Sequence, residues 1–287
     1  MIVSMAVFGS IGLFVRYVPF PSIVIAAFRG LSGAAFIYIF MALGGKRPVL
    51  KDRGKTLFLL ALSGCAIGVN WILLFESYRY TTVARATLCY YMQPVIVMLL
   101  SPVLASERLT ARKLISVIIS FLGMILVTGA AGGTIGGTGE LRGIALGLGA
   151  ACFYSTVIFL NRLLRDTDDM TTTFYQLLFA GLSVLPLALT QELPLPAASP
   201  AQWAALAAVG ILHTGAAYTA YFSAMHELDT QTTAMLGYID PVCALFFSWM
   251  LLGESPDAGT VTGAVMILGG TLLGSIEKRK ETDHGQN

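Results

Sequence analysis

The chain has 287 residues, of which 56% are hydrophobic and only 12% are charged, whereas soluble globular domains carry roughly 25% charged residues. This composition excludes a soluble globular protein and predicts an integral membrane protein. The formal net charge of +2 is too small to indicate a nucleic-acid-binding surface.

Ten apolar segments follow one another along the chain, and each approaches the length of about 20 residues that a helix needs to cross a bilayer. No strand-like alternation of apolar and polar residues is visible, so the segments predict an all-α membrane protein with ten transmembrane helices. The first segment has no basic residues before it and no A-x-A cleavage motif after it, so we expect no cleaved signal peptide. The expected spans are residues 2–18, 21–43, 56–78, 82–104, 110–130, 141–164, 171–190, 201–225, 229–252 and 258–276.

The basic residues are distributed unevenly between the two sides of these spans. If the N-terminus is cytoplasmic, only Arg16, Arg79 and Arg142 lie outside. This asymmetry satisfies the positive-inside rule and predicts a cytoplasmic membrane protein with both termini in the cytoplasm. The basic residues expected inside are Lys46, Arg47, Lys51, Arg53, Lys55, Arg108, Arg112, Lys113, Arg162, Arg165, Lys278, Arg279 and Lys280.

The two halves of the chain repeat each other at a spacing of 147 residues. Five spans is an odd number, so the second half enters the membrane in the opposite orientation, which is an inverted-topology repeat typical of secondary transporters. The expected halves are residues 1–130 and 141–276, joined by a glycine-rich linker at 131–140 and followed by a polar tail at 277–287. The aligned pairs include Gly68 with Gly215, Tyr91 with Tyr238, Pro94 with Pro241, Glu107 with Glu254, and Gly123 with Gly270.

A doubled pattern of a mid-helix proline and a glutamate at the helix end, together with Arg29 and the ten spans, resembles the EamA family of the drug/metabolite transporter superfamily. The resemblance covers nearly the whole chain. Members of that family export amino acids and other metabolites, and relatives import nutrients such as choline or sugars. The resemblance therefore implies a secondary transporter that works by alternating access, without naming its substrate.

Asp240 is the most informative single residue, because it lies near the middle of the ninth span, where a carboxylate costs about 2.5–3.5 kcal/mol on insertion scales. It has two interpretations as a functional group: it binds a cationic group of the substrate, or it takes up a proton for coupling. The structural alternative is a protonated acid bonded to a carbonyl that Pro241 leaves without a donor. Gln93 is its neutral counterpart in the first half.

Two further charged residues occupy similar depths near the outer ends of their spans. Arg29 is a candidate for binding a substrate carboxylate, or for an ion pair with Glu76 that holds the bundle together. Arg79 and Arg85 lie near the outer interface, where we expect them to snorkel towards water.

Aromatic and amide side chains gather at the expected mid-membrane depth and predict a substrate cavity suited to an ammonium group or an apolar amino acid. His213 is either a neutral core residue or a proton relay with Asp240. Glu107 and Glu254 are expected to be structural, and Pro94 and Pro241 to allow helix bending. The cavity candidates are Asn70, Trp71, Tyr90, Tyr91, Tyr218, Tyr221 and Tyr238.

Glycine pairs at a spacing of four residues predict close helix contacts. They are Gly64 with Gly68, Gly143 with Gly147, and Gly270 with Gly274.

No cofactor or metal is expected, because the four cysteines lie in apolar stretches without CxxC spacing and no P-loop is present.

The favoured function is transport of a small polar metabolite, an amino acid or a related amine, by a monomer or homodimer in the lipid bilayer, with protons as a possible coupling ion. One alternative is an uptake carrier for a cationic nutrient such as choline. A second is an intramembrane serine protease, because residues 30–33 (GLSG) resemble the G-x-S-G of rhomboids, with Ser32 as nucleophile and His213 as base.

Overall fold

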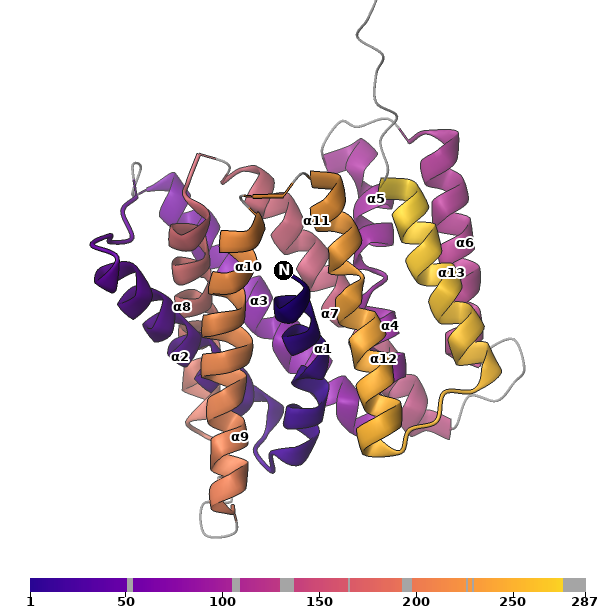
Figure 1. Ribbon diagram of the computed structural model, residues 1–287, viewed down its shortest axis with the longest axis horizontal. Coiled ribbons are helices and arrows are strands. Elements are labelled where there is room, and N and C mark those ends of the chain that lie inside the picture. Colours follow the sequence, from indigo (N-terminus) through magenta and orange to yellow (C-terminus); the bar gives the residue numbers. More distant parts are fainter. Residues whose placement is uncertain are drawn as a thin grey trace, which may run out of the picture.

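The computed structural model describes residues 1–50, 54–104, 109–129, 137–164, 166–192, 198–225, 227–228 and 230–275. These residues form helices and connecting turns, without a strand (Figure 1). The helices are α1 (Ile2–Tyr17), α2 (Ser22–Leu43), α3 (Lys55–Tyr80), α4 (Val83–Tyr90), α5 (Gln93–Leu104), α6 (Ala111–Val127), α7 (Gly137–Arg162), α8 (Asp169–Ala188), α9 (Pro200–Gly210), the π-helix η2 (Ile211–Ala216), α10 (Ala217–Met225), α11 (Thr230–Gly237), α12 (Ile239–Leu252) and α13 (Ala258–Ser275).

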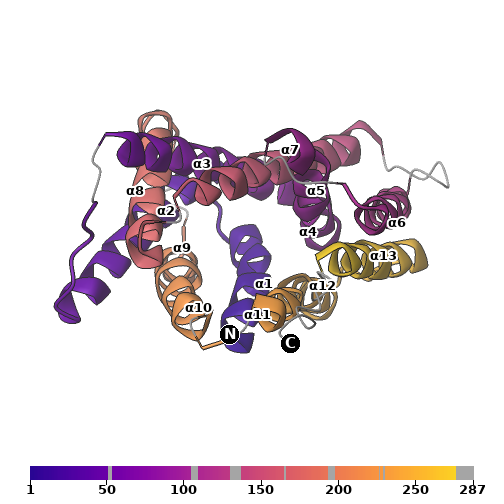
Figure 2. The same cartoon turned by 90° about the horizontal axis from the view of Figure 1, so that it is seen from above.

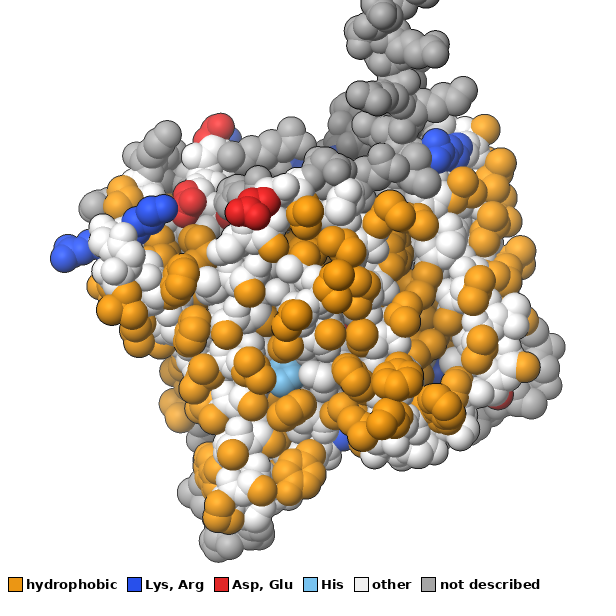
Figure 3. Space-filling view, viewed as in Figure 1, with side chains coloured by type: hydrophobic (Ala, Val, Ile, Leu, Met, Phe, Trp, Pro, Cys, Tyr) orange, Lys and Arg blue, Asp and Glu red, His pale blue; other side chains and the backbone are white. Residues whose placement is uncertain are grey.

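Within the described residues, eight helical segments are long and apolar enough to cross a membrane. The apolar α1 is shorter, with 16 residues, and α6 has 17. Hydrophobic side chains cover the middle of the face in Figure 3, and most of the charged side chains visible there lie along its upper margin. The expectation of an all-helical membrane protein is confirmed.

Each expected span falls on a helix or on consecutive helices, with ends shifted by a few residues. The largest shift is at α7, which begins at Gly137, inside the stretch that we assigned to the linker. Glu107, most of that linker and the tail at 277–287 lie outside the described residues.

Two spans are interrupted near their middle, at the positions that the sequence repeat aligns. The first break is a turn at Tyr91 and Met92, between α4 and α5, and the second is at Tyr238, between α11 and α12. Each break comes just before Pro94 or Pro241, whose rings remove a backbone donor and crowd the preceding turn. The helix is therefore interrupted before each proline, and bending at these points during gating stays a prediction.

Several helix starts are fixed by side-chain caps. Thr82, Thr110 and Asp168 each accept a bond from the backbone N–H three residues later, and Ser199 forms a capping box with Gln202 at the start of α9. These bonds satisfy amide groups that a helix leaves without partners at its first turn. They set where each helix starts and therefore which residues reach the membrane centre.

Small residues let pairs of helices approach closely, as the glycine spacing predicted. A Cβ atom at Gly64 would lie 2.7 Å from the Gln176 carbonyl oxygen of α8, and one at Gly147 would lie 3.0 Å from Cys89 Cβ of α4. Gly270 lies against Ser116 and Ser120, which joins α13 to α6. Figure 1 shows α13 beside α6 at one end of the molecule and α2 beside α8 at the other.

Seen from above, α1 lies between the α9–α10 segment and the α11–α12 segment (Figure 2). It packs on α12, α9 and α10, while α3 and α7 lie across from it (Figure 2). We call the side where α7 and α13 end the upper face, and the side where α4 and α9 begin the lower face, as they appear in Figure 1.

Candidate functional site

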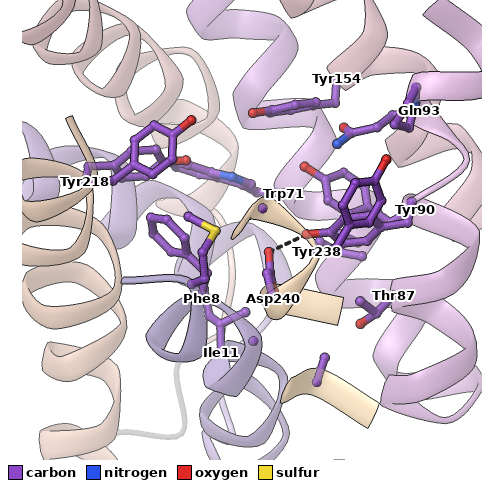
Figure 4. Close-up of a pocket in the computed structure, with 18 of the residues that line it drawn as sticks. Phe8, Ile11, Trp71, Thr87, Tyr90, Gln93, Tyr154, Tyr218, Tyr238 and Asp240 are labelled. Carbon is purple, nitrogen blue, oxygen red and sulfur yellow. Dashed lines mark hydrogen bonds between the residues drawn. The ribbon is translucent and has the colours of Figure 1, made fainter. Parts of the chain in front are cut away.

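A cavity of about 550 Å³ occupies the centre of the bundle, and residues of both halves line it. It extends from Tyr78 and Thr87, near the lower face, to Asn161 and Ser275, in the last turns of α7 and α13 at the upper face. Both helix breaks contribute to its wall through Tyr91 and Tyr238. Figure 4 shows aromatic rings around the space beside Asp240.

Asp240 lies in the first turn of α12, directly after the second break, and its side chain lines the cavity. The positive end of the α12 dipole favours a carboxylate at this position. The Tyr91 hydroxyl donates a hydrogen bond of 2.7 Å to Asp240 Oδ2, the dashed line in Figure 4. This bond joins the break of the first half to the break of the second.

Arg29 is buried, with 6% of its surface exposed, and it also lines the cavity. Its Nε donates to Thr214 Oγ1 at 2.8 Å, and its guanidinium lies 4.1 Å from the centroid of the Trp71 ring. Among the described residues, no carboxylate forms an ion pair with this guanidinium. A buried cation that no carboxylate contacts directly is costly, and the nearest opposite charge acting on it across the cavity is that of Asp240.

The proposed pair of Arg29 and Glu76 is wrong. Glu76 accepts a bond of 2.7 Å from Ser22 and lies 3.6 Å from the Arg79 Nε atom, outside the cavity. The two residues share a similar depth, but Arg29 points between α3 and η2.

The aromatic candidates converge on the cavity, where the structure brings together Trp71, Tyr90, Tyr91, Tyr218, Tyr221 and Tyr238. Sequence reasoning missed Phe8, Tyr78, Tyr154 and Phe222, which line the same space. Phe8 packs against Tyr218 with ring centroids 5.1 Å apart. Tyr154 could have been found by the same criterion as the others, since it is an aromatic residue near the middle of its span.

Besides Glu76, two sequence candidates do not line the cavity. Asn70 is fully buried, and its Nδ2 donates to the Ala150 carbonyl at 2.6 Å, which links α3 to α7. His213 lies in the π-helix, where its ring nitrogens contact Ser10 Oγ at 2.9 Å and the Ala208 carbonyl at 3.1 Å. A direct relay between His213 and Asp240 is therefore not formed in this structure.

The residues of the protease alternative are also engaged elsewhere. The Ser32 hydroxyl donates to the Phe28 carbonyl at 2.5 Å rather than to His213. The hydrogen bond between nucleophile and base that such an enzyme needs is not formed here.

At the lower face, a network of charged groups joins the two halves, and we call it the lower-face network. Arg16 pairs with Glu254 and donates to the carbonyls of Tyr78 and Thr81, each at 2.8 Å. Glu254 also accepts from the backbone N–H of Val83 at 2.9 Å and from the Ser248 hydroxyl. The expectation that Glu254 is structural agrees with these contacts.

Arg85, which we expected to snorkel at the outer interface, contributes a second part of this network. It pairs with Glu140 at the start of α7 and with Asp257, at 2.9 Å, before α13. The backbone N–H of Thr260 donates to Asp257, and together with Arg85 it holds the pKa of that carboxyl below its ordinary value. The Asp257 carboxyl thus stays charged at neutral pH.

The structure is a helical bundle with two interrupted helices and an aromatic-lined central cavity that holds Arg29 and Asp240, and known proteins resemble it in sequence and fold. The sequence model of the EamA-like transporter family matches residues 1–129 and again residues 141–276. The chain belongs to the EamA-like transporter family. It is a multi-pass membrane transporter.

Relatives and a solved structure extend this result. An uncharacterized transporter of Bacillus subtilis, YxxF, is 30% identical over 97% of this chain and 89% of its own length. The aromatic amino acid exporter YddG of Ancylobacter novellus is 23% identical over 72% of this chain and 71% of its own. A crystal structure superposes with a TM-score of 0.63 at 19% identity, covering 95% of this chain and 94% of that chain, which shows a shared fold.

Proposed function

We propose that the chain is a secondary active transporter for zwitterionic amino acids with apolar or aromatic side chains. The observation that carries the proposal is that Arg29, a buried cation without a carboxylate partner among the described residues, lines the same cavity as the carboxylate of Asp240. In this proposal the Arg29 guanidinium binds the substrate carboxylate, and Asp240 binds its ammonium group. The aromatic walls hold the side chain.

The contacts of Arg29 orient its guanidinium for binding a substrate carboxylate. Its Nε is occupied by Thr214 and one face of the guanidinium lies over Trp71, so rotation is restricted while the terminal nitrogens remain available for a bidentate bond. A purely cationic nutrient such as choline would leave Arg29 without a counterion. The residue therefore favours a zwitterion over the choline-like alternative.

Transport proceeds by alternating access between two inverted five-helix halves with ten transmembrane helices. The double match of the family sequence model and the helix breaks at aligned positions support this architecture. The described basic residues Lys46, Arg47, Arg112, Lys113 and Arg162 lie near the upper face, which supports a cytoplasmic upper face and cytoplasmic termini. The cavity then faces the cytoplasm, with the lower face closed.

Asp240 is also the proposed site of proton coupling. A carboxylate that exchanges a proton for an ammonium group, in the same cavity, would let the proton gradient drive amino acid movement. Full transport with an unchanged pH profile in Asp240→Asn would contradict this part of the proposal.

Ligand-induced thermal stabilisation of the purified protein tests the substrate class, because a ligand that binds the folded state raises its apparent stability by mass action. The probes are phenylalanine, its decarboxylated amine phenethylamine, N-acetylphenylalanine and choline. We expect stabilisation by phenylalanine and weaker stabilisation by the other three.

Single substitutions identify which side chain binds the substrate carboxylate and which binds its ammonium group. Arg29→Gln should abolish the preference for phenylalanine over phenethylamine, and Asp240→Asn should abolish the preference for phenylalanine over N-acetylphenylalanine. Glu76→Gln is the matched control, because its carboxylate lies outside the cavity, and it should keep both preferences. Equal stabilisation of the unaltered protein by phenylalanine and phenethylamine would refute the role of Arg29.

A further inference from the structure

The hydrogen bond between Tyr91 and Asp240 connects the two helix breaks. Tyr91 lies at the turn between α4 and α5, and Asp240 comes directly after the turn between α11 and α12. Because each break is a point where backbone bonds are missing, the two breaks can change their angle at low cost. A bond between them therefore holds the two halves in one relative position.

The sequence repeat predicts a second bond that is equivalent to the one between Tyr91 and Asp240. The same spacing of 147 residues that aligns Pro94 with Pro241 also aligns Tyr91 with Tyr238 and Gln93 with Asp240. Exchanging the two halves therefore converts the bond from Tyr91 to Asp240 into a bond from Tyr238 to Gln93.

That counterpart is not formed in this structure. Gln93 Oε1 is buried and has no hydrogen-bond partner among the described residues, although the Gln93 side chain lines the cavity. The Tyr238 hydroxyl instead interacts with Thr271 and Ser275 of α13. Both labelled side chains border the space beside Asp240 in Figure 4.

Because no described protein group donates to Gln93 Oε1 here, this acceptor is available to the Tyr238 hydroxyl in another state. In an inverted repeat, the two facing states arise when the halves exchange their conformations around a fixed site. A group left unsatisfied in one state is then satisfied in the other. An acceptor at Gln93 without a protein donor in this state is what such an exchange predicts.

We propose that Tyr91 and Tyr238 are positioning residues that hold alternate states of the transport cycle. The bond from Tyr91 to Asp240 stabilises the state in which the cavity reaches the upper face, and the bond from Tyr238 to Gln93 stabilises the state that opens at the lower face. The inference rests on the proposed alternating access between inverted halves. It does not depend on the identity of the substrate.

The hydrogen bond between Tyr91 and Asp240 also couples binding at Asp240 to the change between the two facing states. A proton at Asp240 neutralises the acceptor of the Tyr91 hydroxyl, and hydrogen bonds to a neutral acceptor are about half as strong as those to a charged one. An ammonium group at Asp240 leaves the carboxylate charged but competes with the Tyr91 hydroxyl for it. Loading the site therefore weakens the bond that holds the upper-face state. The bond from Tyr238 to Gln93 lacks this sensitivity, because Gln93 carries no charge.

The test measures which face the cavity opens to, in the absence of substrate. Thr87→Cys places a reporter thiol on the cavity wall, in a chain whose four native cysteines are replaced by serine. Membrane-impermeant maleimide is applied to right-side-out and to inside-out vesicles. The ratio of the two labelling rates reports the balance between the facing states.

Tyr91→Phe should raise the ratio of lower-face to upper-face labelling by roughly 10- to 100-fold, because it removes a bond to a charged group. Tyr238→Phe should lower the ratio by roughly 2- to 10-fold, because it removes a bond between neutral groups. Gln93→Met should shift the ratio in the same direction as Tyr238→Phe, without adding to it in the double variant. Tyr90→Phe is the matched control, since Tyr90 lines the cavity but aligns with Gly237, and it should leave the ratio unchanged.

Opposite shifts by the two tyrosine variants are the result that a merely structural role would not give. Shifts in the same direction, or none, would overturn the proposal. Glu254→Gln separates this failure from a failure of alternating access, because it weakens the lower-face network and leaves Tyr91 and Tyr238 unchanged. If Glu254→Gln raises lower-face labelling and the tyrosine variants do not, only the exchange is refuted; if every variant is labelled from one face only, alternating access is refuted too.

Discussion

The contact between α6 and α13 depends on the absence of side chains at its centre, and Gly123→Ala tests it. A Cβ atom at Gly123 would lie 2.7 Å from the Gly263 carbonyl oxygen, 2.8 Å from Met266 Cβ and 3.0 Å from the backbone nitrogen of Ile267. Two of these three atoms belong to the backbone of α13, so no side-chain rotation can relieve the overlap with them. The two helices must move apart by several tenths of an ångström.

The expected cost is set by two opposing terms. Overpacking of this kind costs about 1–3 kcal/mol, while replacing a helical glycine by alanine returns about 1 kcal/mol through helix propensity. Separation of the helices also lengthens the bonds from Ser116 to the Gly270 carbonyl and from Ser120 to the Ile267 carbonyl. We therefore expect a net loss of about 1–2 kcal/mol in the free energy of unfolding.

Equilibrium unfolding of the purified protein in mixed micelles titrated with sodium dodecyl sulfate measures this change. Gly269→Ala on α13 is the matched control, because a Cβ atom there meets no atom within 4 Å, and it should be neutral or stabilising by up to about 1 kcal/mol. If Gly123→Ala is as stable as Gly269→Ala, close approach does not determine the stability of this contact.

Two further predictions concern the lower-face network. Glu254→Gln should lower the free energy of unfolding by about 1–3 kcal/mol, because it removes the charge that pairs with Arg16 at a mostly buried site; no change in sodium dodecyl sulfate unfolding would mean that the network is not stabilising. For Asp257, the carboxyl pKa is lowered from 3.8 by the Thr260 amide and Arg85, so its contribution is complete above about pH 4 and is lost as the pH falls through the lowered pKa. The difference in melting temperature between the unaltered protein and Asp257→Asn should therefore be constant from pH 7 to pH 5 and close below pH 4, and a difference that instead shrinks between pH 7 and pH 5 would contradict this account.

The sequence was sufficient to locate the helices, because membrane spans are set by length and hydropathy, which are local properties. The sequence also pointed to Pro94 and Pro241 as places where a helix bends, since proline acts on the turn that precedes it, but it did not predict that each span is divided into two helices there. Asp240 could be singled out for the same reason, because a carboxylate in an apolar segment stands out without knowledge of its neighbours.

The partners of the charged residues could not be predicted in the same way. Depth in the membrane is given by position along a helix, at about 1.5 Å per residue, so Arg29 and Glu76 were matched by depth. The direction in which each side chain points depends on how the helices pack, and it separates this pair. Arg85 was likewise assigned by depth alone, while its partners Glu140 and Asp257 come from distant parts of the chain.

The π-helix η2 was not predicted, and it sets the rotation of α10, the helix directly after it. A π-turn contains one residue more than an α-turn, so every later residue is rotated by about 100° relative to a regular helix. The backbone N–H of Ala217 bonds the Leu212 carbonyl five residues earlier, which marks that extra residue. Deleting one residue between Ile211 and Ala216 would restore a regular helix and turn Tyr218 and Tyr221 away from the cavity. This single inserted position therefore sets the direction in which α10 presents its aromatic side chains.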